Sequence, residues 1–287
     1  MRTGDIDDAE VLTREEFHAL DVATRPTDWP TPVPRGDALR RAWRRRCSHL
    51  LKHDARGCWV AEDAAGLVGV ATSLRRETMW ILSSFAVRNG AQGQGVGARL
   101  LEAALTHSEG CIRGMIDSSN DPRAVRRYHR AGFTIHPHML VHGVVERSHI
   151  PVIEHVRDGS IGDLELMNSV DRLVRDAAHL VDHDFIAHEH NLRVVADTTG
   201  SGYVYVPANG GAYLLAATNR RTASRLLWDA LAATREGEQI TVDCLTGEQD
   251  WAIDVATEAG LGVYQRGYLA LRFMKPPAPY IPSPHFL

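Results

Sequence analysis

The chain has 287 residues, of which 44% are hydrophobic and 24% charged, and its formal net charge is -4. This composition is that of a globular protein with one large domain or two moderate ones. Because the net charge is weak, a general attraction to polyanions is excluded, and we expect neither a nucleic acid nor a membrane as a partner.

The four cysteines lie far apart and form no CxxC pair, so their spacing favours neither a disulfide framework nor a zinc site. The sequence has no signal-peptide pattern and no long uncharged apolar run. We therefore expect a cytoplasmic protein.

The first half alternates between helical and extended patterns. A basic stretch, Arg40 to Arg56, has apolar residues at helical spacing and predicts a helix with a solvated face, or alternatively a binding patch. The strands and helices that follow are predicted, in chain order, at 57–63, 66–76 and 78–87 (strands), 98–107 (helix), 111–119 (strand), 120–132 (helix) and 133–145 (strand). This order predicts an α/β fold with a mixed, mostly antiparallel sheet flanked by helices.

The second half repeats this pattern more weakly. The stretch ASRLLWDALAA, 223–233, resembles GARLLEAALTH, 97–107, at an offset of about 126 residues. A second similarity, DWAIDVATEAGL to RAVRRYHRAGF, has an offset of about 128. Two similarities at nearly one offset indicate an internal duplication. We predict two repeats, 1–147 and 148–274, and a Pro-rich tail, 275–287, that is extended and either lies across the other repeat or is a loose terminus.

A glycine-rich stretch, QGQGVGARLL, lies between a predicted strand and a predicted helix. The first amides of a helix are unpaired, and the helix dipole adds partial positive charge there, so such a turn suits a phosphate group. Neither a dinucleotide fingerprint nor a Walker loop fits, because the glycines are spaced G-x-G-x-G and no Gly-Lys-Ser/Thr follows.

Two motifs resemble those of the GNAT superfamily of N-acetyltransferases. The first is Gln/Arg-x-x-Gly-x-Gly/Ala, here Gln92, Gly95 and Gly97 after a strand that ends in FAV. The second is Asn-x-x-x-Ala-x-x-x-Tyr-x-x-x-Gly-Phe, which is matched by Asn120, Ala124, Tyr128, Gly132 and Phe133. The resemblance extends over about 57–143.

The resemblance implies acetyl-CoA as co-substrate, with no metal. It implies that loop amides hold the CoA pyrophosphate and that the end of the preceding strand pairs with the pantetheine amides. We expect the helix of the second motif to begin at Asn120 as its N-cap. The cofactor-binding residues expected are Phe85, Ala86, Val87, Gln92, Gly93, Gln94, Gly95, Val96, Gly97, Ala98, Asn120, Arg123, Ala124 and Arg127.

Transfer of an acetyl group to an amine needs a donor to the carbonyl oxygen, a base for the amine and an acid for the thiolate. The resemblance implies that the amide near Val87 polarises the carbonyl and that Tyr128 protonates the sulfur. Many relatives carry a glutamate on the strand before the loop, whereas this strand has serines instead. The base is therefore left open between a water held by Ser83 and Ser84, Glu77 at the start of the strand, and a histidine from elsewhere.

In the second repeat, Arg221 takes the position of Gly95, and Ala256 takes that of Tyr128. We therefore expect a degenerate repeat without its own acetyl-CoA site, which supplies one wall of an acceptor pocket.

A segment of the second half, DAAHLVDHDFIAHEHN, is rich in histidine and acidic residues. It predicts a solvated helix end, or an acidic wall for a cationic amine formed by His179, Asp182, His183 and Asp184. The HxxxH spacing leaves a metal site as a third interpretation.

The leading hypothesis is an enzyme that acetylates a primary amine. The acceptor is an amino sugar of an antibiotic such as kasugamycin, a polyamine-like metabolite, or a protein amine, and we favour a small molecule because a tandem fold can close over it. Tandem enzymes that finish mycothiol have a similar layout but keep the better CoA site in the second repeat. The alternatives are an acyl-CoA sensor and a nucleotide-binding protein outside the GNAT superfamily. We expect a monomer or a homodimer.

Overall fold

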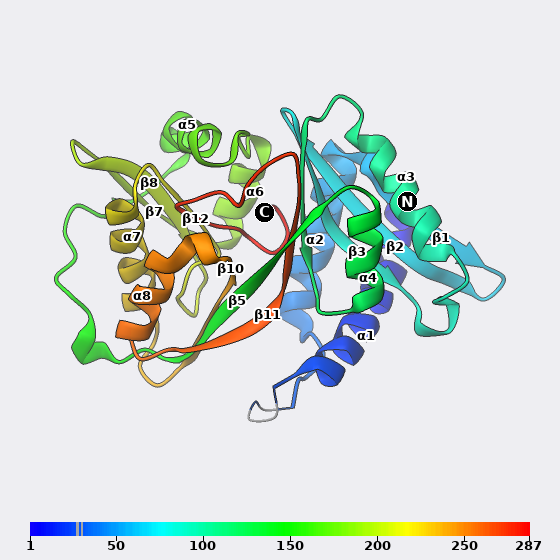
Figure 1. Ribbon diagram of the computed structural model, residues 1–287, viewed down its shortest axis with the longest axis horizontal. Helices are drawn as coiled ribbons and strands as arrows, with labels where there is room; N and C mark the ends of the chain where they lie inside the picture. The colour runs from blue at the N-terminus through cyan, green and yellow to red at the C-terminus, as the bar shows by residue number, and fades with distance from the viewer. Residues whose placement is uncertain (27–28, 30) are drawn as a thin grey trace. The chain divides into compact units, whose positions relative to one another are not determined.

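The computed structural model describes residues 1–26, 29 and 31–287 (Figure 1). It divides into two compact units: the first comprises 1–75 and 80–111, and the second comprises 76–79 and 112–287. Both units contain strands flanked by helices, which confirms the α/β class.

In the first unit, three strands lie in the order β1-β2-β3. The strands fall where the sequence predicts them, and the helices Asp37–His53 and Val96–Leu105 do so to within a few residues, whereas the helix Ile6–Thr24 was not predicted. Their bounds are Ile6–Thr24 (α1), Asp37–His53 (α2), Cys58–Asp63 (β1), Gly66–Arg76 (β2), Met79–Val87 (β3) and Val96–Leu105 (α3). The core of this unit includes Trp43 and Cys47 of α2, which pack with Val70 of β2 and Ala86 of β3.

The basic residues of α2 are used within the first unit. Arg40 lies 3.3 Å from Glu10 of α1, whose side chain is fully buried, and Arg44 lies 2.6 Å from Asp7. These ion pairs attach the polar face of α2 to α1. Trp43, Cys47 and Leu50 point into the core, whereas Leu39 is exposed.

In the second unit, four strands lie in the order β4-β11-β5-β10, and the registers between neighbours are antiparallel. Their bounds are Arg113–Ser118 (β4), Thr134–Val144 (β5), Gln239–Leu245 (β10) and Gly262–Arg272 (β11). The strand β5 therefore lies between two strands that come more than 90 residues later in the chain. Because β5 pairs there, the strands and helix after Ile112 belong to the second unit, and the division does not follow the predicted boundary near 147.

The second sheet of this unit has the order β12-β9-β8-β7-β6. Its strands are Arg157–Asp158 (β6), Asn191–Asp197 (β7), Gly200–Val206 (β8), Leu214–Ala217 (β9) and Tyr280–Ile281 (β12). The α-helices of the unit are Pro122–Arg130 (α4), Leu164–Arg175 (α5), Val181–Glu189 (α6), Arg220–Ala232 (α7) and Asp250–Glu258 (α8).

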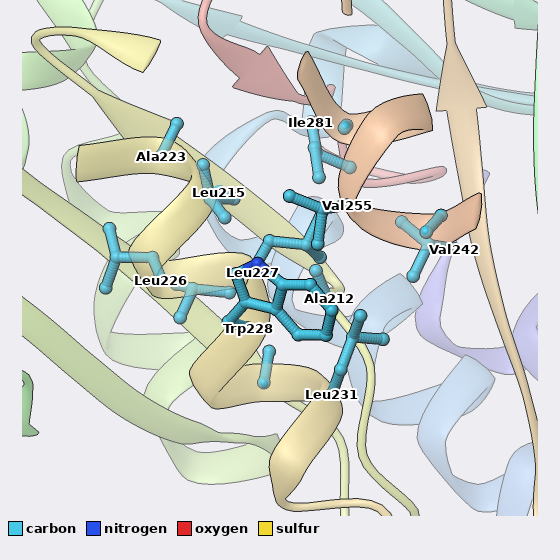
Figure 2. Packing of buried hydrophobic residues seen from close by; sticks show 14 of the residues in the cluster. Ala212, Leu215, Ala223, Leu226, Leu227, Trp228, Leu231, Val242, Val255 and Ile281 are labelled. Atoms are coloured by element: carbon cyan, nitrogen blue, oxygen red, sulfur yellow. The ribbon is translucent and has the colours of Figure 1, made fainter. Parts of the chain in front are cut away.

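Alternation along β8 separates an apolar layer from a polar one. Val204 and Val206 belong to the large hydrophobic cluster that includes Trp228 of α7. Figure 2 shows how the α7 residues of this cluster pack. Tyr203 and Tyr205 point to the opposite face, where their hydroxyls reach α5 and α6. Since successive side chains of a strand face opposite sides, β8 holds a dry core and a buried polar network at once.

The Pro-rich tail is extended, as predicted, and it is not loose. Tyr280 of β12 pairs with Ala216 of β9, and both Phe286 and Leu287 are fully buried. The final residues therefore pack within the second unit, and the prediction of a loose terminus is wrong.

Two pairs of elements match in length across the halves. Helices α4 and α8 have 9 residues each, and strands β5 and β11 have 11 each. Their first residues are 122 and 250, and 134 and 262, so the offset is 128 in both cases. The strands β5 and β11 also pair with each other, from Thr134 opposite Leu271 to His142 opposite Gly262.

Candidate active site

The glycine-rich loop of the first unit enters α3 through left-handed backbone. Gly93 and Gly95 have φ of +80° and +83°, which L residues with a side chain rarely adopt. A Cβ atom built on either glycine would meet nothing within 4 Å, so the space above the loop is open.

The amides of this loop are available to a ligand. Those of Ala98 and Arg99 donate to the Gly95 carbonyl at 3.1 Å. Among the described residues, none of the amides from Gly93 to Gly97 donates to an acceptor of the chain, and no side chain caps α3. An uncapped helix start with free amides fits an anionic group such as a pyrophosphate.

The end of β3 is held by the same loop. The Gln92 side-chain amide donates to the Val87 carbonyl at 2.9 Å, and the Arg88 amide donates to Val68 of β2 at 2.8 Å. Ala86 is buried in the core, whereas Phe85 and Val87 are half-buried. Gln92 thus ties the loop to the strand that precedes it, while Gln94 is exposed and donates to the Gly90 carbonyl.

In the second unit, Asp121 caps α4. Its carboxylate accepts the Arg123 amide at 2.9 Å and also pairs with the Arg123 guanidinium at 3.0 Å. The prediction that Asn120 is the N-cap is therefore wrong by one residue, since Pro122 opens the helix and Asp121, directly before it, accepts the free amide. Asn120 instead accepts a hydrogen bond from Gln265 of β11 at 3.2 Å.

Tyr128 lies on the inner face of α4 and is only 4% exposed. Burial raises the pKa of its hydroxyl far above the ordinary value, with Arg127 opposing this and Asp117 adding to it. The hydroxyl therefore keeps its proton at neutral pH, as a proton donor to a thiolate must. Arg127 and Ala124 of the same helix are half-buried.

The candidates for the base differ in what surrounds them. Neither carboxylate oxygen of Glu77 is free, because one accepts a hydrogen bond from Arg172 at 2.8 Å and the other accepts the Ala178 amide at 3.0 Å. Ser83 and Ser84 of β3 are both buried, and the Ser83 hydroxyl has no partner among the described residues. Glu77 therefore anchors Arg172 and the backbone at Ala178, whereas the hydroxyl of Ser83 can still bond to a water or a ligand.

The predicted substrate histidines form a buried network. His179 Nδ1 and His183 Nε2 lie 2.8 and 2.9 Å from the same oxygen of Asp171, and Tyr203 donates to the other oxygen at 2.5 Å. Both histidines are fully buried, so the prediction of a solvated helix end is wrong. His179 also precedes α6, which begins at Val181, so the two histidines do not share a helix face.

The two acidic residues of that segment are separated by the fold. Asp182 is fully buried and forms two hydrogen bonds with Arg76, at 2.6 and 2.7 Å. Asp184 remains exposed, near His188. The cation that Asp182 binds is thus a residue of the chain.

The second half has no counterpart of the glycine loop. Asn219 caps α7 by accepting the Thr222 amide at 2.9 Å, which occupies the helix start. A pocket of about 440 Å³ lies beside this helix and includes Arg221 and Arg225, of which Arg225 pairs with Asp197 at 2.8 Å.

A further polar cluster was missed by sequence reasoning. Asp117, His138 and Cys244 come from three strands of the second unit, and each offers a ligand atom within 4.8 Å of the others. Their spacing in the chain has no local pattern. The one sequence signal is that Asp243 and Cys244 follow directly after the short stretch Ile240 to Val242.

Comparisons with known proteins concern the segment that contains the glycine-rich loop and α4. Residues 54–135 match the family profile of the acetyltransferase (GNAT) domain. No curated protein sequence matches the chain. This part of the chain is therefore similar to a GNAT acetyltransferase domain, which supports an acyltransferase.

Solved structures share the fold over most of the chain. A candidate acetyltransferase of Pyrococcus horikoshii has a TM-score of 0.72 at 16% identity, covering 96% of this chain and 88% of that one. GCN5-related N-acetyltransferases of Sphaerobacter thermophilus (TM-score 0.55, 14% identity, 95% and 93% covered) and Kribbella flavida (0.53, 16%, 91% and 70%) are also similar. At these identities the likeness concerns the fold alone. No helix among the described residues is both long and apolar enough to span a bilayer.

Proposed function

We propose that this protein transfers an acetyl group from acetyl-CoA to the primary amine of a small molecule, of which an amino-sugar antibiotic such as kasugamycin is one candidate. The observation that carries the proposal is the uncapped start of α3, where Gly93 and Gly95 hold left-handed backbone below open space. Amides free of chain partners from Gly93 to Gly97 suit the pyrophosphate of a CoA thioester.

In this reaction the neutral amine attacks the acetyl carbonyl, and the carbon–sulfur bond breaks. The main-chain amide near Val87 polarises the carbonyl oxygen, and Tyr128 gives its proton to the departing thiolate. The raised pKa of Tyr128 keeps the phenol protonated until the thiolate departs, and the protonated phenol is the form that the second role requires.

The amine proton leaves through a water held at β3 in this proposal. Ser83 has a buried hydroxyl for which the described part of the chain supplies no partner, and Ser84 lies next to it. Both oxygens of Glu77 are already engaged, which argues against that carboxylate as the base. Buried polar groups without partners in the chain are commonly satisfied by an ordered water.

The second half is proposed to be a degenerate GNAT repeat. The equal lengths and common offset of α4 with α8 and of β5 with β11 support this, as does the pairing of β5 with β11. The Asn219 cap and the absence of glycines at the start of α7 argue against a second CoA site there.

The test follows CoA release with a thiol reagent across a panel of amines: kasugamycin and other aminoglycosides, polyamines, cysteine conjugates and short peptides. We expect turnover with one small amine. Replacement of Tyr128 by Phe should lower kcat by about 10²–10⁴-fold and leave CoA affinity unchanged. Replacement of Tyr213 by Phe, at a half-buried position in the second unit, is the matched control and should keep full activity.

Other outcomes distinguish the alternatives. Tight acetyl-CoA binding by calorimetry without turnover of any amine would favour an acyl-CoA sensor, for which the missing carboxylate on β3 is the specific indication. Acetylation of peptides and of no other amine would indicate that the acceptor is a protein amine and not a small molecule. Affinity for ATP or NAD without affinity for CoA would refute the proposal.

A further inference from the structure

Two β-bulges of the second unit bring polar side chains together. The register between β11 and β5 shifts between Gln265 and Gly267, and that between β10 and β5 shifts between Val242 and Leu245. Bulges re-aim side chains and are frequent beside functional sites. Here both bulges border His138 of β5, which lies opposite Gly267.

Gly267 allows contact across an intervening strand. The strands β4 and β5 are not neighbours, because β11 lies between them, yet His138 Nε2 is 2.9 Å from Asp117 Oδ1 of β4. A Cβ atom at Gly267 would lie 2.2 Å from the Ser118 carbonyl oxygen and 3.3 Å from His138 Nε2. A side chain at Gly267 would therefore obstruct this contact.

Cys244 enters the cluster through strained backbone. Its φ is +62°, a left-handed value that costs about 1–2 kcal/mol for a residue with a side chain. Its thiol is fully buried, and its sulfur lies within 4.8 Å of ligand atoms of Asp117 and His138. Such strain persists where the surrounding structure imposes it, and it clusters at functional sites.

We propose that Asp117, His138 and Cys244 bind a divalent transition-metal ion of the zinc class. One carboxylate oxygen, one imidazole nitrogen and one sulfur lie within 4.8 Å of one another, and this mixed donor set is typical of Zn²⁺. Binding releases the thiol proton and any proton on the ligating nitrogen to solvent. The Asp117 side chain is 24% exposed, so a water can complete the coordination.

The surroundings of His138 support the assignment. A metal-bound histidine usually donates its other ring nitrogen to a carboxylate. With Nε2 towards Asp117, the remaining Nδ1 faces Asp243 Oδ1 at 3.7 Å and has no hydrogen-bond partner among the described residues. Asp243 is itself held by the Cys244 amide at 2.7 Å, and Arg266 lies 3.7 Å from its other oxygen.

The second buried cluster lacks this arrangement. In the network of Asp171, His179 and His183, Arg175 Nη1 lies 2.6 Å from His179 Nε2. Because a guanidinium only donates, Nε2 has to accept and Nδ1 carries the proton that bonds to Asp171. A metal ion on Nδ1 would leave Nε2 protonated and opposed to Arg175. The arrangement therefore argues against a metal ion in this network and favours a structural role.

The experiment measures metal in the full chain. The protein is stripped with a chelator, titrated with Co²⁺ or Zn²⁺, and followed by the thiolate-to-cobalt charge-transfer absorption and by elemental analysis. We expect one ion per chain and a charge-transfer band, which Cys244→Ser abolishes. Asp243→Asn should weaken Co²⁺ binding by about 10–100-fold while keeping the band, since it removes only the orienting carboxylate.

Two controls keep the result interpretable. Cys111→Ser removes a cysteine of the first unit and His183→Gln disrupts the other cluster, and both should bind metal as the unaltered chain does. Circular dichroism verifies that each variant is folded, and Asp117→Asn provides a second ligand variant if Cys244→Ser unfolds. Binding without a charge-transfer band, a band that survives Cys244→Ser in folded protein, or no stoichiometric binding would overturn the proposal.

Discussion

The ion pair between Arg76 and Asp182 is expected to be the most sensitive polar contact of the second unit. Arg76 is 4% exposed and Asp182 is fully buried, and the pair forms two hydrogen bonds at 2.6 and 2.7 Å. A hydrogen bond to a charged group contributes about 1.5–3 kcal/mol. Removing one partner of a buried pair costs about 3–5 kcal/mol, because the other charge stays buried without compensation. We therefore expect Arg76→Ala to lower the free energy of unfolding by about 3–5 kcal/mol.

Urea unfolding followed by tryptophan fluorescence measures this loss, and two further variants test its cause. The double variant Arg76→Met, Asp182→Leu removes both charges and should recover to within about 1 kcal/mol of the unaltered chain, or exceed it. Arg172→Ala breaks the neighbouring pair with Glu77, which lies at 2.8 Å and has side chains that are 48% and 29% exposed. This variant should lower the free energy of unfolding by about 1 kcal/mol or less. An Arg76→Ala loss as small as that of Arg172→Ala, or a double variant no more stable than the single one, would refute the reasoning.

Three other variants test local features by the same unfolding measurement. Asp121→Ala should lower the free energy of unfolding by about 1 kcal/mol, because α4 loses its cap, and Asn120→Ala should lower it clearly less. The reverse order would identify Asn120 as the cap. Gly95→Ala should lower the free energy of unfolding by about 1 kcal/mol, because the φ of Gly95 is +83°. Gly36→Ala should not, because the φ of Gly36 is -72°. Equal effects of the two substitutions would contradict the role of the left-handed backbone. Burial lowers the pKa of His190 from 6.5 to about 4. As the pH drops from 6.5 to about 4, the unfolded chain binds a proton at this histidine and the folded chain does not, so the free energy of unfolding falls in this range and is unaffected above it. His190→Gln should remove about 1–2 kcal/mol of that fall, and an unchanged pH profile would contradict the assignment.

Local order was predictable from the sequence. Apolar periodicity placed α2, and alternation between Gly57 and Val87 placed the three strands of the first unit. The glycine-rich stretch marked the turn between the last of these strands and α3, where Gly93 and Gly95 have left-handed backbone. These features depend on residues close together in the chain, so a short window contains the determining information.

What escaped prediction depends on pairing between distant segments. The burial of His179 and His183 requires Asp171 and Tyr203 from other elements. No local pattern distinguishes a histidine that bonds to such partners from one in solvent. The contact of His138 with Asp117 likewise requires β11 to enter between β4 and β5, which the sequence order of the strands does not reveal.

The position of β5 between β11 and β10 has a consequence for synthesis of the chain. When the ribosome has added Val144, β5 is complete but both of the strands that flank it are still untranslated, since they span Gln239–Leu245 and Gly262–Arg272. An apolar strand with two open edges is a template for association with other nascent chains. The protein is therefore expected to need chaperone shielding during translation, and a fragment ending at 147 should aggregate unless the remainder of the chain is supplied in trans.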